Sequence, residues 1–311
     1  MQKNKLTAFT LIELLVVIAI IGILSALIVV GMSSTTQKAT IAKAQVFSNS
    51  LRNSLMSNLV SEYKFEGTGT PDALATIADV VDLWGSNNSS ALNGNPYVRG
   101  GSNCLSGKCI SFDGAGDSFT VPDSATLDTI FGTENFTLEA WIYSVKYTAD
   151  YQGIINKRTD AYYSASPGGI FIDSDGDTLR FLIGTGNESE TYDSCTASIA
   201  ALHDKWIHIT ATAGGGYMKL YINGLQVGST TTITKNPTTN NEPMTIGGFY
   251  AGGRNFSGRM DEIRIYNAPV PTSQTQQNYF AGLNKLLAKN IITQQDYNNR
   301  FVSLNQNTAK N

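Results

Sequence analysis

The chain has 311 residues, a formal net charge of −3 and only 15% charged residues, which excludes the basic footprint of a nucleic-acid-binding protein. The chain is long enough to hold a sizeable globular domain in addition to an N-terminal helix, and it is rich in Gly, Ser, Thr and Asn. This composition favours an extracellular β domain over a helical one.

The N-terminal segment contains a continuous apolar run over residues 8–31 with a single charged side chain, Glu13. A helix of about 23 residues reaches about 35 Å, which is enough to cross the hydrocarbon core of a bilayer. A secretory signal peptide has its small-residue cleavage site after the apolar run, whereas Ala8 precedes this one. Two lysines in the leader predict that residues 9–31 span the cytoplasmic membrane once, with the rest of the chain outside.

This segment, AFTLIELLVVIAIIGIL from Ala8 onward, resembles the prepilin signal of type IV pilins and type II secretion pseudopilins. The resemblance implies that a prepilin peptidase removes the leader, residues 1–8, between Ala8 and Phe9 and methylates the new amine of Phe9. It also implies that the helix remains as the packing core of a filament, with other pilin subunits as partners.

Glu13 requires a partner, because a carboxylate inside a membrane helix costs about 2.5–3.5 kcal/mol. The Phe9 amine released by cleavage lies one helical turn away, at i,i+4 spacing. Glu13 is therefore predicted to pair with this amine in its own helix or in a neighbouring subunit, where the pair would also set the register. A simple membrane anchor that tolerates one Glu near the interface is the alternative.

An amphipathic segment follows the apolar run. Apolar residues recur at helical spacing at Phe47, Leu51, Leu55 and Leu59. The pattern predicts that the N-terminal helix continues over residues 32–63 and ends near Gly67.

Residues 64–268 consist of short alternating segments bounded by Gly, Asn and Asp, which is typical of an antiparallel sandwich or jelly roll. The predicted strands are Ile110–Phe112, Ser118–Val121, Phe136–Ser144, Gly153–Asn156, Gly169–Asp173, Leu179–Gly184, Trp206–Ala213, Met218–Ile222, Leu225–Ser229, Met244–Gly247 and Arg259–Tyr266. Asn223-Gly224 predicts a type I′ hairpin turn. In the strand 136–144, even-numbered residues are expected on one face and odd-numbered residues on the other.

Five segments in this region are similar, in order, to laminin G-like, concanavalin A-like lectin domains. They are residues 111–122, 136–142, 205–210, 221–224 and 256–267. The resemblance implies a jelly roll that binds glycans or protein surfaces, often around a calcium ion. It places an acidic calcium ligand at Asp117 and Asp261, which an ordinary turn and a strand end would also explain. The acidic segment 173–177 is expected to be a polar hairpin turn.

Sugar recognition combines flat aromatic rings with polar groups, and such residues usually lie in loops. The candidate ligand residues in predicted loops are Tyr162, Tyr163, Tyr192, Phe249, Tyr250, Arg254 and Asn255. The two histidines, His203 and His208, are expected to be structural. Catalysis is not expected, because glycoside hydrolysis needs two facing carboxylates and adjacent residues of a strand, such as Asp261 and Glu262, point to opposite faces.

Cys104 and Cys109 are close enough in sequence to close a small loop by a disulfide in an oxidising compartment, which the outward topology permits. A metal site would need further ligands nearby, and the sequence offers none. Cys195 is expected to be a buried or free thiol. The tail, residues 271–311, has helical spacing interrupted near Asn290, with Thr293 placed to cap a second helix, and is predicted to form a helical hairpin.

These observations predict an α+β chain of several parts: leader, long N-terminal transmembrane and amphipathic helix, antiparallel jelly-roll sandwich, and C-terminal helical hairpin. The predicted function is that of a pilin-like subunit of a type IV pilus or type II secretion-like filament. Its outward head would bind glycan or surface protein, first at the cytoplasmic membrane and then on the extracellular filament. The alternatives are a pseudopilin that engages secreted substrates and a membrane-tethered carbohydrate-binding protein that does not polymerise.

Overall fold

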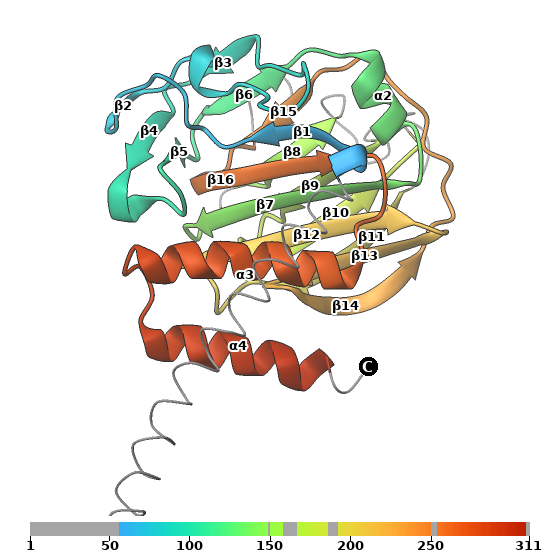
Figure 1. Cartoon of the computed structure of the whole chain (residues 1–311). Helices are drawn as coiled ribbons and strands as arrows, with labels where there is room; N and C mark the ends of the chain where they lie inside the picture. The colour runs from blue at the N-terminus through green and yellow to red at the C-terminus, as the bar shows by residue number, and fades with distance from the viewer. Residues whose placement is uncertain (1–55, 149, 158–166, 186–191, 250–253, 309–311) are drawn as a thin grey trace, which may run out of the picture. The chain divides into compact units, whose positions relative to one another are not determined.

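The computed structural model describes residues 56–308 apart from 149, 158–166, 186–191 and 250–253, and we call this part the head. Two antiparallel β-sheets form a sandwich, and two C-terminal helices lie beside one of them (Figure 1). Residues 9–55 of the predicted N-terminal helix lie outside the described residues.

Within the head, the larger sheet has nine strands, in the order β14-β13-β12-β7-β16-β5-β4-β2, with β1 paired to β16. Their bounds are β1 Leu59–Tyr63, β2 Ala73–Leu74, β4 Tyr97–Gly100, β5 Lys108–Asp113, β7 Phe136–Ser144, β12 Trp206–Gly214, β13 Tyr217–Ile222, β14 Leu225–Thr232 and β16 Ser257–Tyr266.

The second sheet has seven strands among the described residues, in the order β11-β10-β9-β8-β15-β6-β3. They are β3 Ala91–Asn93, β6 Ser118–Val121, β8 Gln152–Lys157, β9 Gly168–Ile172, β10 Thr178–Ile183, β11 Asp193–Ser198 and β15 Met244–Ile246. The helices are α2 Ala125–Phe131, α3 Thr272–Ala288 and α4 Gln294–Thr308, with short 3-10 turns at Met56–Asn58, Ile77–Asp79 and Gly101–Asn103.

The hydrophobic core lies between the two sheets, because inward-facing residues of both contribute to one buried cluster. Phe136 of β7 meets Phe181 of β10 edge-on, with ring centroids 5.8 Å apart. Along β7, Phe136, Leu138, Ala140 and Ile142 belong to this core, whereas Trp141 packs on the opposite face with α3. The predicted β-sandwich and the predicted alternation of faces are both confirmed.

Every strand predicted from the sequence has a counterpart among the observed strands, with shifts of one to three residues at some ends. The Asn223-Gly224 turn joins β13 to β14, and both residues have positive φ, +52° and +77°. Positive φ at both central residues is characteristic of the type I′ turn, and Asn and Gly adopt this backbone conformation with little strain.

The prediction of a helix through residue 63 is wrong for its last turn. Leu59–Tyr63 forms strand β1, antiparallel to β16, with Glu62 opposite Arg264. Tyr63 is fully buried in the sandwich core, and Glu62 Oε1 accepts a hydrogen bond from Arg264 Nε at 2.8 Å. Pairing with a distant strand and burial of Tyr63 therefore outweigh the local helical spacing.

The predicted C-terminal helical hairpin is confirmed by α3 and α4. The Tyr279 ring of α3 stacks on Trp141 of β7 at 5.7 Å, and Leu283 and Leu286 complete the same buried cluster. Between the helices, the Thr293 hydroxyl accepts a hydrogen bond from the Asp296 N–H at 3.1 Å, which caps α4 as expected. The hairpin therefore covers part of the outer face of the nine-stranded sheet.

Candidate functional site

The predicted processing residues, Ala8, Phe9 and Glu13, lie outside the described residues. The predicted membrane span, residues 9–31, lies there as well. Within the head, none of the helices is both long and apolar enough to cross a membrane. The candidate sites that can be built from contacts all belong to the head.

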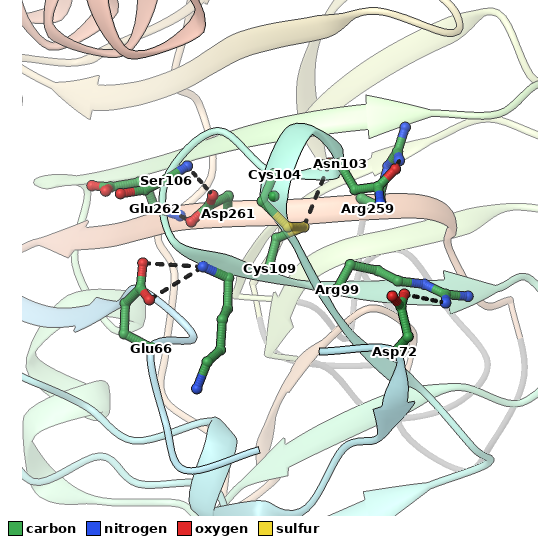
Figure 2. Close-up of a disulfide and its surroundings, with 12 residues drawn as sticks. Glu66, Asp72, Arg99, Asn103, Cys104, Ser106, Cys109, Arg259, Asp261 and Glu262 are labelled. Atoms are coloured by element: carbon green, nitrogen blue, oxygen red, sulfur yellow. Dashed lines mark hydrogen bonds and ion pairs between the residues drawn. A yellow bond between two sulfur atoms is a disulfide. The ribbon is translucent and has the colours of Figure 1, made fainter. Parts of the chain in front are cut away.

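Cys104 and Cys109 form the predicted disulfide, with 5.4 Å between their Cα atoms. The bridge closes the loop that precedes β5, and Figure 2 shows Ser106 of this loop facing Asp261 of β16. Cys195 is a buried free thiol, and burial raises its pKa to about 12. This thiol is neutral at physiological pH and therefore a poor nucleophile.

The predicted sugar-binding residues have different environments. Tyr162, Tyr163 and Tyr250 lie outside the described residues, and Tyr192 is exposed immediately before β11. Asn255 is buried: its side-chain amide donates to the Asp117 carbonyl and its Oδ1 accepts the Gly116 N–H, both at 3.0 Å. Asn255 therefore stabilises the turn between β5 and β6.

Phe249 and Arg254 are brought together on the outer face of the seven-stranded sheet. The Arg254 guanidinium lies 5.4 Å from the Tyr151 ring centroid and 5.9 Å from that of Phe249. Phe249 also packs edge-on against Phe171 at 5.6 Å. Because Phe249 is only 2% exposed, it supports this surface rather than presenting a free face for stacking on a sugar.

The two predicted calcium ligands lie in different elements: Asp117 in the turn between β5 and β6, and Asp261 within β16. Asp117 accepts the N–H of Asn95 at 2.6 Å and that of Asp113 at 3.0 Å, one at each carboxylate oxygen. Asp113 is opposite Ser257 at the start of β16. Asp261 lies four residues beyond Ser257 along β16, which is about 13 Å from Ser257 at a rise of about 3.3 Å per residue.

The donors around these carboxylates do not suit a calcium ion. Asp261 accepts the N–H of Ser106 at 2.9 Å and that of Glu262 at 2.8 Å. Burial and the charge of Glu262 raise the pKa of Asp261 well above its usual range, and burial raises the pKa of Asp117. Calcium needs six to eight oxygen ligands, and within the head no three acidic, His or Cys side chains gather as a metal site. Asp117 and Asp261 therefore do not fit a shared calcium site.

A cage of oxygen atoms elsewhere in the head surrounds an ammonium group. Lys157 is completely buried at the end of β8, and its Nζ donates to the carbonyls of Asn240 at 2.9 Å and Glu242 at 2.7 Å. The same nitrogen pairs with Asp123 and lies 3.6 Å from Asp128. Carboxylates and carbonyls are the ligand types that calcium prefers, but here the lysine ammonium satisfies them.

The acidic segment 173–177 forms the polar β9–β10 turn that the sequence predicts. The Asp175 carboxylate accepts the N–H groups of Asp177 and Thr178, at 2.8 and 2.9 Å. His203 connects this turn to β7 through hydrogen bonds to Asp177 and Ser144, both at 2.9 Å. The contacts of His203 are those expected of a structural residue.

Beneath α3, a buried charged network occupies the outer face of the nine-stranded sheet. Arg264 contacts Glu62 at 2.8 Å, Glu139 at 3.1 Å, and Glu262. Burial alone would lower the pKa of Arg264, but these carboxylates, Glu262 above all, raise it well above its usual value. His208 Nε2 lies 3.2 Å from Glu139, and both side chains are fully enclosed. The network is paired internally and inaccessible to a substrate.

An open pocket of about 340 Å³ lies farther along the same face of the sheet. It is lined by Arg99, Asn103, Ser111, Phe112, Tyr143, Val145, Ser257, Gly258 and Arg259. Gly258 has φ +143°, and a Cβ there would collide with the carbonyl oxygen of Tyr143, so glycine permits the close approach of β16 to β7. This pocket was not identified from the sequence. Arg259 lies in a predicted strand and Arg99 in the short strand β4, and only the register between these strands shows that the two arginines lie near each other.

Two segments of the chain match known families. Residues 113–275, just over half of the chain, match the concanavalin A-like lectin/glucanases superfamily. Residues 4–29 match the prokaryotic N-terminal methylation motif. No curated protein matches the chain.

Several solved structures share the fold of the head. The receptor binding domain of botulinum neurotoxin C/D mosaic serotype is 18% identical with a TM-score of 0.56, covering 73% of this chain and 52% of that one. The binding domain of Paraclostridial Mosquitocidal Protein 1 is 18% identical with a TM-score of 0.54, covering 74% and 53%. The binding domain of botulinum neurotoxin DC in complex with SialylT is 14% identical with a TM-score of 0.53, covering 73% and 52%. The chain spans about half the length of these structures, and at such identities the likeness is one of fold.

Proposed function

The chain belongs to the concanavalin A-like lectin/glucanases superfamily, and we propose that it is a pilin-like filament subunit whose head binds glycan or protein on a surface. The observation that carries the proposal is the presence of two modules in one chain. A methylation motif over residues 4–29 precedes a lectin-like domain over residues 113–275. The first is the processing signal of pilin-like subunits, and the second is a fold used for recognition.

The filament part of the proposal depends on the chemistry of the N-terminal segment. Cleavage before Phe9 creates a cation one helical turn from Glu13, which is otherwise the single charge in an apolar run. Pairing between the two groups removes the cost of an isolated carboxylate in the membrane. In a bundle of subunits, the same pair fixes the axial position of each helix against its neighbour. The filament is of the type IV pilus or type II secretion kind.

The adhesive part of the proposal is supported by the fold of the head and by its open pocket. The similar solved structures are described as binding domains, one of them in complex with SialylT. We propose that the head of this chain likewise binds, and that it does not catalyse. The expected alternation of Asp261 and Glu262 is wrong, because β16 is irregular there and Glu262, with φ +49°, lies on the same outer face as Asp261. Glu139 and Glu262 are both ion-paired with Arg264 and are 0% and 2% exposed.

Processing and assembly are tested together in the native host. Mass spectrometry of the mature protein should find an N-terminus at methylated Phe9, and cells that carry Glu13→Ala should assemble fewer filaments containing this subunit. Glu66→Ala, which removes an acid from the head, is the matched control and should assemble normally. Normal incorporation of the Glu13→Ala subunit would overturn the pairing role. A mature protein that starts at Met1 would favour a tethered protein that does not polymerise.

Adhesion is tested by probing a glycan array with the full-length chain in detergent micelles. Binding to a defined set of glycans supports the lectin-like head. If the array is blank while the chain co-purifies with exported proteins, the head engages secreted substrates instead, which is the pseudopilin alternative.

A further inference from the structure

The pocket is part of a stripe of side chains that crosses five neighbouring strands. Tyr97 of β4 is opposite Ser111 of β5, Ser111 is opposite Arg259 of β16, and Arg259 is opposite Tyr143 of β7. Tyr143 is in turn opposite Trp206 of β12. Residues directly opposite in antiparallel strands point to the same face. The stripe therefore places the Arg259 guanidinium between the Ser111 hydroxyl and the Tyr143 ring on the outer face of the sheet.

Arg259 is held in a fixed orientation within this stripe. Its guanidinium carbon lies 3.8 Å from the centroid of the Tyr143 ring, at stacking distance. Its Nη1 donates to Asn103 Oδ1 at 3.1 Å, as Figure 2 shows. A guanidinium has five N–H donors, so further donors remain after this hydrogen bond. Stacking and the Asn103 contact thus prepare Arg259 to donate to a bound group in the pocket.

The pocket carries excess positive charge. Arg99 also lines it and pairs at 2.9 Å with Asp72, a largely exposed carboxylate, so this surface pair contributes little stability. Within the head, Arg259 has no carboxylate within 4.0 Å, although Asp204 is near enough to act on it at longer range. Burial and the nearby charge of Arg99 lower the pKa of Arg259. A bound anion would stabilise the charged form of Arg259 against both its burial and the repulsion from Arg99.

We propose that this pocket binds the carboxylate of an acidic sugar residue, with Arg259 as the principal ligand and Arg99 as the second. The assignment rests on the proposed function of the head and specifies the class of glycan that it recognises. A planar guanidinium pairs with a carboxylate through two parallel hydrogen bonds, which a lysine ammonium cannot reproduce.

The remaining lining suits one sugar ring rather than an extended peptide. The volume of about 340 Å³ lies at the small end of the range for small-molecule sites, about 300–1,000 Å³. Ser111 and Ser257 offer hydroxyl groups that can exchange hydrogen bonds with sugar hydroxyls, and the exposed side chain of Val145 adds apolar contact area.

The proposal is tested by saturation-transfer NMR titrations of the full-length chain in detergent micelles. The probes are D-glucuronic acid, N-acetylneuraminic acid and the neutral methyl ester of glucuronic acid. We expect at least one of the acids to bind about tenfold or more tightly than the ester, because charge-assisted hydrogen bonds carry this difference. Equal binding of the ester, or binding of none of the probes, would overturn the proposal.

Arg259→Gln should weaken binding of the acid about tenfold or more, and Arg259→Lys should rescue it only in part, since the lysine keeps the charge but not the planar fork. Lys205→Gln, which removes an exposed cation beside Trp206, is the matched control and should bind as the wild type does. Arg99→Gln provides a second variant should Arg259→Gln fail to fold, and it should weaken binding to a smaller extent. Equal effects of Arg259→Gln and Lys205→Gln would indicate general electrostatic attraction and contradict a built site.

The titrations with acidic sugars and the glycan array can fail independently, so the two proposals are tested separately. A head that binds neutral glycans on the array but ignores the acids remains a lectin-like head with a different ligand. A head that binds no glycan at all contradicts both.

Discussion

The carboxylate of Asp261 accepts the backbone N–H of Ser106 at 2.9 Å, across 155 positions of sequence. Ser106 lies within the loop closed by Cys104 and Cys109, and the ammonium of Lys289 donates to the Ser106 carbonyl at 2.8 Å. A small covalent loop is thus held on one side by the central strand β16 and on the other by the residue that ends α3.

Removing the disulfide should destabilise the head. In the chain-entropy account, a loop of this size contributes about 2 kcal/mol by restricting the unfolded chain. We expect the double variant Cys104→Ala/Cys109→Ala to lose about that free energy of unfolding in urea denaturation. Ser106→Ala is the control, because it keeps the backbone N–H that Asp261 accepts, and it should change stability little. Equal stability of the double variant and the wild type would contradict this role.

Asp261 should make the head less stable as the pH rises. Its pKa is raised in the folded state, mainly by burial, so the folded chain retains a proton that the unfolded chain releases above about pH 4. Stability from this group is therefore lost between about pH 4 and the raised pKa. Thermal unfolding of Asp261→Asn from pH 4 to pH 8 should show a flatter pH dependence than the wild type. An unchanged slope would show that Asp261 does not titrate in this interval.

Glu262, the next residue, should have the opposite effect. Burial alone would raise its pKa, but the Arg264 guanidinium and the Lys285 ammonium, 2.5 Å from Glu262, lower it to about 2. The stability that it supplies is fully present above about pH 4.5 and is lost as the pH falls toward 2. Glu262→Gln should cost on the order of 3 kcal/mol at pH 7 and leave a smaller loss on acidification. Lys64→Gln, which removes the most distant of the three cations paired with Glu262, at 3.1 Å, should cost much less.

Gly282 should resist substitution although it lies inside helix α3. Alanine has a higher helix propensity than glycine, by about 1 kcal/mol. A Cβ at Gly282, however, would collide with the indole ring of Trp141, and overpacking of a core typically costs about 1–3 kcal/mol. Gly282→Ala is therefore expected to lower the melting temperature, and Ala281→Gly, at an exposed position, isolates the propensity effect. A stabilised Gly282→Ala would mean that α3 does not pack closely on β7.

Lys157 should be essential to the stability of the seven-stranded sheet. Lys157→Met would leave Asp123 and Asp128 beside two carbonyls with no cation, and because these carboxylates are 28% and 30% exposed, the cost should be below the about 3–5 kcal/mol of a fully buried pair. We expect a matching loss in urea denaturation, with calcium restoring part of it because the vacated oxygen cage has the ligand types that calcium prefers. Lys219→Met, outside this cage, is the control. A variant as stable as the wild type would show that the pairing contributes nothing.

The sandwich could be predicted from the sequence because its strands carry strong local signals. Strand β7 alternates between core residues such as Leu138 and outward residues such as Glu139, and its predicted bounds are the observed ones. The Asn223-Gly224 dipeptide encodes its turn through backbone energetics alone. The pairing of Cys104 with Cys109 follows from their separation.

Other features depend on tertiary contacts that local sequence does not encode. Strand β1 has a helical spacing of apolar residues, and its pairing with β16, two hundred positions away, decides its conformation. Strands β2, β3, β4 and β11 and helix α2 have no counterpart among the predicted elements, because these short segments carry few apolar residues in a clear alternating or helical pattern. The stripe around Arg259 joins residues from five strands, so it becomes visible only when the register of each pair is known.

In the proposed filament, where the head is anchored through its N-terminal segment, the position of β1 determines where mechanical load enters the head. Strand β1 follows directly after the segment that leads to the N-terminal apolar run, and it pairs with β16, which also pairs with β5 and β7. A pull transmitted through the N-terminal segment therefore acts first on the β1–β16 hydrogen bonds and on the Glu62–Arg264 contact. Under tension, detachment of β1 and exposure of Tyr63 would precede disruption of the strands that carry Arg99 and Arg259.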